Sequence, residues 1–138
     1  GTGYQSFTRE WKNGDRLFLT LDMRVQAVLP PDGACNEDDY CAYRRGPVML
    51  SADARLGKDP GRAFAVMYDK KSLDVPNARL VSCQEIPEAR LAVEVPTSEG
   101  ASIRLIDYSS CGKTWDQNSR CAVWLSNGHS EHSITVVK

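Results

Sequence analysis

Apolar and polar residues alternate with a period of two along much of this chain, which is the pattern of half-buried β-strands. The clearest case lies between residues 16 and 23, where apolar side chains occupy every odd position: Leu17, Leu19, Leu21 and Met23. Phe18 is the apolar exception among the even positions. Asn13-Gly14, just before this segment, is a typical two-residue hairpin turn because both residues tolerate positive φ. We therefore predict a hairpin over residues 7–23 that packs on the core, and Leu19→Asp should then unfold the domain.

The rest of the chain contains further short apolar segments rich in Val, Ile and aromatic residues. The predicted strands are 25–29, 41–45, 48–50, 63–67, 80–83, 90–95, 101–108, 120–125 and 133–137. No segment has a clear amphipathic helical pattern. About nine short strands separated by turns indicate an all-β protein. We predict an antiparallel β-sandwich of jelly-roll-like form.

Length and charge exclude several classes of protein. The chain has 138 residues, so residues 1–138 are expected to form one domain. Its formal charge is -1, from 17 basic and 18 acidic residues, and no stripe of Lys or Arg is present. We therefore expect neither a nucleic-acid partner nor an anionic membrane partner. No apolar run approaches the roughly 20 residues that a membrane span requires.

The cysteines do not follow a metal-binding pattern. There are five, an odd number: Cys35, Cys41, Cys83, Cys111 and Cys121. Because no CxxC pair occurs, we expect no zinc site and no other cofactor. Most of these side chains are expected to be small apolar residues in strands. One or two disulfides remain an alternative.

A possible sugar-binding surface is indicated by an aromatic residue followed by hydrogen-bonding side chains. Trp115 precedes Asp116, Gln117 and Asn118 in a predicted loop. Sugars stack their C–H faces on aromatic rings and hydrogen-bond through their hydroxyls. We take Trp115, Asp116 and Tyr43 as candidate carbohydrate-binding residues. The alternative is that Trp115 closes one end of the sandwich.

Two charged residues are candidates for contact with a neighbouring domain. Arg45 precedes a Gly-Pro break and could direct its guanidinium at a carboxylate on another strand or another domain. Asp15 follows the Asn-Gly turn, where it could hydrogen-bond the turn backbone or meet a neighbouring domain. His129 and His132 fall in one predicted loop, which leaves little from which to build a Ser-His-Asp set. We predict that the chain is not an enzyme on its own.

Two segments resemble the C-terminal β-sandwich region of glycoside hydrolase family 127, the β-L-arabinofuranosidase family. The first contains residues 9–15 (REWKNGD), 19–25 (LTLDMRV) and 45–48 (RGPV). The second contains residues 105–115 (LIDYSSCGKTW) and 123–125 (VWL). These motifs occur in the same order and with similar spacing as in the family, and together they extend over most of the chain.

This resemblance implies an accessory domain of a larger glycoside hydrolase. Chemistry in that family belongs to an N-terminal helical barrel, and no residue here matches its catalytic motif. The expected partner is that catalytic barrel, and plant-type glycans are a second candidate partner. The resemblance alone favours a periplasmic or secreted location. The alternatives are a carbohydrate-binding module and a free-standing interaction domain.

Overall fold

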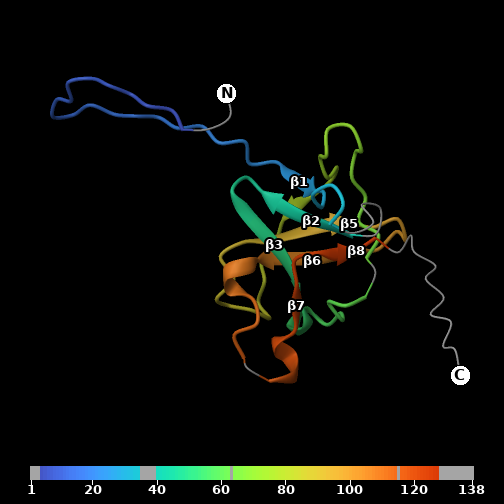
Figure 1. Cartoon of the computed structure of the whole chain (residues 1–138). Helices are drawn as coiled ribbons and strands as arrows, with labels where there is room; N and C mark the ends of the chain where they lie inside the picture. Colours follow the sequence, from blue (N-terminus) through green and yellow to red (C-terminus); the bar gives the residue numbers. More distant parts are fainter. Residues whose placement is uncertain (1–3, 35–39, 63, 115, 128–138) are drawn as a thin grey trace, which may run out of the picture.

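The computed structural model describes residues 4–34, 40–62, 64–114 and 116–127, and this part of the chain is all-β. The eight strands are β1 (Val25–Val28), β2 (Tyr40–Arg45), β3 (Val48–Asp53), β4 (Arg79–Leu80), β5 (Ala92–Pro96), β6 (Ser102–Asp107), β7 (Cys121–Ala122) and β8 (Leu125–Ser126). They pair in the order β1-β2-β3-β6-β5-β4, while β7 joins β3 and β8 joins β2. Every pairing is antiparallel. The sheet curls into the β-sandwich-like arrangement of Figure 1.

Three short 3-10 helices connect the strands. They are η1 (Ala54–Leu56), η2 (Tyr108–Ser110) and η3 (Gln117–Ser119). The described residues include no α-helix, and no helix there is long and apolar enough to cross a membrane.

The alternating sequence pattern explains the register of the central strands. Val93 lies opposite Leu105, and Val95 lies opposite Ile103, so one face of the β5–β6 pair is apolar. All four side chains are buried and belong to one core cluster. Cross-strand contacts between β-branched and aliphatic side chains stabilise such a pair.

Five of the predicted strands between residues 25 and 126 are confirmed, whereas the strand predicted over 80–83 overlaps β4 only at Leu80. The segment 63–67 is an exception, because its described residues contribute only an isolated bridge from Val66 to Thr97. The prediction for 120–125 is also only partly right, since β7 and β8 are separated by two residues. The predicted strand 133–137 lies outside the described residues.

The predicted hairpin over residues 7–23 is wrong in its packing. Residues 4–23 contain no strand, and they extend away from the sheet as an arm (Figure 1). Leu19 is 78% exposed, and it makes no part of the core cluster. The expectation that Leu19→Asp unfolds the domain is therefore wrong as well. The period-2 pattern is present, but the described part of this chain does not cover its apolar face.

Candidate functional site

The arm, residues 4–23, presents the largest set of exposed apolar side chains in the described structure. They are Tyr4, Phe7, Trp11, Leu17, Phe18, Leu19, Leu21 and Met23. Exposed apolar surface gathered in one place marks an interaction site more often than single exposed residues do. The arm is therefore the leading candidate for a functional surface.

The predicted turn at the tip of the arm is confirmed. Gly14 has φ 91°, and the Asp15 amide donates to the Lys12 carbonyl at 3.0 Å. The Asp15 carboxylate accepts from the Lys12 amide at 2.9 Å and from the Arg9 guanidinium at 2.8 Å. Asp15 thus closes the turn, as its position after Asn-Gly predicts. A contact from Asp15 to a neighbouring domain stays a prediction.

The arm joins the sheet at the β2–β3 turn. Gly46 has φ 56° there, and a Cβ at this position would lie 2.5 Å from the Met23 sulfur. Arg24 bonds Asp22 at 2.7 Å and Asp74 at 2.5 Å, which ties the base of the arm to a distant loop. The hydrogen bonds from Arg24 lower the pKa of Asp22 to about 2.

Arg45 lies at this same base, opposite Val25 in the β1–β2 pair. Together with Met23 and Asp74 it lines a cavity of about 310 Å³. Among the described residues, no carboxylate pairs with its guanidinium. A contact from Arg45 to a neighbouring domain stays a prediction, and Arg45 lies where the arm leaves the sheet.

The candidate sugar-binding residues do not form one surface. Tyr43 is fully buried in the core, where its hydroxyl lies 3.5 Å from the Asn127 side-chain oxygen. Burial raises the pKa of Tyr43 well above its ordinary value. A sugar cannot reach this ring, so the assignment of Tyr43 is corrected to core packing. Trp115 lies outside the described residues.

Asp116 has a local role in its loop. Its carboxylate accepts from the Asn118 amide at 2.7 Å and from the Thr114 hydroxyl at 3.0 Å. The Ser119 hydroxyl accepts from the Asp116 amide at 3.0 Å, which completes a capping box for η3. Capping boxes satisfy the free amides at the start of a helix. The position of Asp116 is explained without a ligand.

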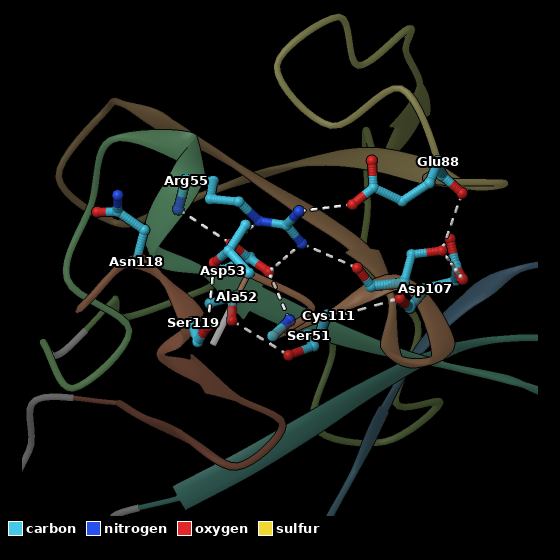
Figure 2. Close-up of polar contacts among 12 residues, drawn as sticks. Ser51, Ala52, Asp53, Arg55, Glu88, Asp107, Cys111, Asn118 and Ser119 are labelled. Carbon is cyan, nitrogen blue, oxygen red and sulfur yellow. Dashed lines mark hydrogen bonds and ion pairs between the residues drawn. The ribbon is translucent and has the colours of Figure 1, made fainter. Parts of the chain in front are cut away.

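An ion-pair network centred on the buried Asp53 joins the end of β3 and η1 to the segment that carries Glu88 and to η2 (Figure 2). The Arg55 guanidinium donates to both Asp53 carboxylate oxygens at 2.9 Å and to Glu88 at 2.6 Å. It also donates to the Ser110 carbonyl at 2.9 Å. Burial acts to raise the pKa of Asp53, but hydrogen bonds from Arg55 and from the Gly112 amide outweigh it and hold that pKa below its ordinary value. Asp53 is ionised and fully satisfied.

Asp107 anchors a second cluster at the end of β6. Its two oxygens accept from the Arg90 and Leu91 amides at 2.9 and 3.1 Å, and from the Ser109 and Ser110 hydroxyls at 2.6 and 2.8 Å. Burial acts to raise the pKa of Asp107, yet these four donors lower it overall. The two clusters meet at Ser110, which bonds Asp107 through its hydroxyl and Arg55 through its carbonyl.

Neither buried carboxylate suits acid catalysis. A general acid requires a pKa raised toward neutrality, whereas both pKa values are lowered here. Every oxygen of Asp53 and Asp107 already accepts hydrogen bonds from the chain. The network holds loops together. The sequence analysis missed it because the two carboxylates that Arg55 bonds, Asp53 and Glu88, are far apart in the chain.

The described cysteines are free thiols. Cys41 is fully buried, as predicted for a small apolar residue in a strand, and its sulfur lies 3.3 Å from the Ala42 carbonyl oxygen. Cys83 and Cys111 are half-buried, and Cys121 is exposed. Burial raises the pKa of Cys111 to about 11, which disfavours a reactive thiolate. Cys35 lies outside the described residues.

Comparisons with known proteins add no further constraint. No protein-family model, no curated protein and no solved structure matches this chain.

Proposed function

We propose that this chain is a non-catalytic accessory domain of a larger carbohydrate-active protein, related to the glycoside hydrolases that its motifs resemble. Its role is to dock against the catalytic barrel of that protein. The observation that carries the proposal is the arm, whose apolar side chains stand clear of the domain's own core. A surface of this kind is stabilised when a partner covers it.

The buried polar groups support a structural role for the body of the domain. Asp53 and Asp107 are ionised and saturated by hydrogen bonds, so they hold loops in place rather than exchange protons with a substrate. The carbohydrate-binding alternative loses support, because Tyr43 is in the core and Asp116 caps η3. A free-standing interaction domain, the other alternative, would also bind its partner through the arm. The two hypotheses differ in whether that partner is the catalytic barrel or another protein.

Calorimetric titration of the chain with the separately expressed catalytic domain of its parent protein tests the proposal. We expect binding by the wild-type chain, and at least a tenfold loss for Leu19→Asp, because a charge would enter the apolar contact. Met67→Asp is the matched control, since Met67 is 47% exposed but does not belong to the arm, and its amide donates to the Pro96 carbonyl. It should bind like the wild type.

Two results would contradict the proposal. Equal binding by wild type and Leu19→Asp would remove the arm from the contact. Hydrolysis of a glycan panel by the isolated chain would show that the domain is itself catalytic, and the same samples can be checked for it.

A further inference from the structure

The backbone of the arm is as unpartnered as its side chains. Its one backbone–backbone hydrogen bond within the described structure closes the turn, from the Asp15 amide to the Lys12 carbonyl. From residue 16 to residue 21, no amide or carbonyl bonds any described residue. An extended segment with free amides and carbonyls is a template for pairing with another strand. Apolar side chains alone do not select a β-strand as the partner, whereas a row of free backbone groups favours one.

We propose that residues 16–22 of the arm pair with the same residues of a second copy of this chain, antiparallel, with Leu19 opposite Leu19. Such a contact is isologous and closes after two copies. This inference goes beyond the proposed function, because it uses the backbone edge of the arm, whereas docking on a catalytic barrel uses its apolar face. Either contact can exist without the other.

The charges select this register. With Leu19 on the two-fold axis, Arg16 of each copy lies opposite Asp22 of the other, so two pairs of opposite charge form. Opposite charges directly across an antiparallel pair stabilise it, and like charges destabilise it. Shifting the register by two residues in one direction places Arg16 opposite Arg24. Shifting the register by two residues in the other direction places Asp15 opposite Leu21 and Arg16 opposite Thr20, so no pair of opposite charges forms.

The apolar positions agree with the same register. Leu17 lies opposite Leu21 on both sides of the axis, and Leu19 meets Leu19, so the two copies form one continuous leucine face. Arg16 has no ion-pair partner within the described part of the chain, so it is available to the other copy. In the single chain Asp22 bonds Arg24. When Asp22 instead pairs with Arg16 of the other copy, Arg24 still has Asp74 as a partner.

Cysteine cross-linking tests the register directly. In Leu19→Cys the two introduced cysteines lie directly opposite, about 4.5–5.5 Å apart between Cα atoms, within the range of a disulfide. In Leu17→Cys the two equivalent positions are about 13 Å apart along the strands, which no disulfide can span. After mild oxidation and trypsin cleavage at Arg16 and Arg24, mass spectrometry identifies any linked 17–24 peptide, so the native thiols do not interfere. We expect the link in Leu19→Cys and its absence in Leu17→Cys.

Charge exchange supplies a second measurement that leaves every apolar residue in place. Sedimentation equilibrium should show dimers of the wild-type chain, and Arg16→Asp should weaken dimerisation about tenfold, because two favourable pairs become two repulsive ones. Arg16→Asp combined with Asp22→Arg should restore it. A chain that stays monomeric at all concentrations, or equal cross-linking at positions 17 and 19, would overturn the pairing. Neither result would affect barrel docking, which the calorimetric titration measures separately.

Discussion

At the scale of single residues, Arg55 is the side chain on which the buried polar network depends. It is 12% exposed and donates to Asp53, whose side chain is fully buried. Arg55→Met would leave the Asp53 charge buried without its counter-ion, and breaking such a pair typically costs about 3–5 kcal/mol. We expect urea unfolding to show this loss as a lower midpoint. Arg120→Met is the control, because Arg120 pairs with Asp59 on the exposed surface and should change little. Equal midpoints for the two variants would contradict the structural role of Arg55.

The lowered pKa of Asp107 leads us to expect that the free energy of unfolding depends on pH. Its pKa is lower in the folded chain than in the unfolded chain, so its ionised form stabilises the fold. This contribution is present above about pH 4, the ordinary pKa of an aspartate, and is lost as the pH falls further. Asp107→Asn should therefore be less stable than wild type at pH 7, and the difference in unfolding free energy should narrow toward pH 3. The exposed Asp32→Asn serves as the control. A difference that stays constant with pH would show that packing, not charge, explains the effect.

What the sequence predicts at single residues depends on how local the contact is. Asp15 follows Asn13-Gly14 directly, and its bond to the turn backbone was predictable from three neighbouring residues. The bond from Arg55 to Glu88 joins residues 33 positions apart, and no motif marks it. Tyr43 failed as a sugar-binding residue because Cys41, Ala42 and Tyr43 are all buried, so both faces of β2 are covered, and the sequence does not show this.

At the scale of elements, the β2–β3 turn controls the base of the arm. Gly46 and Gly57 both have positive φ, but only at Gly46 would a Cβ meet another residue, Met23. Alanine at either site should cost about 1–2 kcal/mol, because L-residues disfavour the left-handed region. Gly46→Ala should additionally displace Met23, and trypsin should then cleave faster at Arg24. Cleavage at Arg24 in Gly57→Ala should match wild type, and a matching increase there would contradict the contact with Met23.

The predicted hairpin shows why a correct pattern can give a wrong placement. The alternation over residues 17–23 indicates that one face of this segment is covered by other apolar groups. The same pattern results whether those groups belong to this chain or to another molecule. Strands β5 and β6 show the same alternation and do cover one another, with Val93 opposite Leu105. The pattern alone therefore shows which side chains share a face, but it does not show whether this chain pairs or covers them.

At the scale of the whole molecule, the described structure consists of a body that contains the whole core and an arm that lies outside it. All buried apolar side chains of the described structure come from residue 27 onward, and Val25 is the first residue to pack against them. The ion-pair and Asp107 clusters likewise lie wholly within the body. The arm adds surface for partners without adding to the core, and so association and folding should respond to different substitutions.

Removing the arm tests this separation. A chain that begins at Met23 keeps every core residue and the methionine that contacts Gly46, so its melting temperature should lie within about 5 °C of the full chain. The same truncation should abolish both binding to the catalytic domain and dimerisation, because both contacts use residues 16–22. Circular dichroism melts at several concentrations measure the first property, and sedimentation measures the second. A much lower melting temperature would show that the arm packs on the body, and persistent dimers would place the interface on the sheet itself.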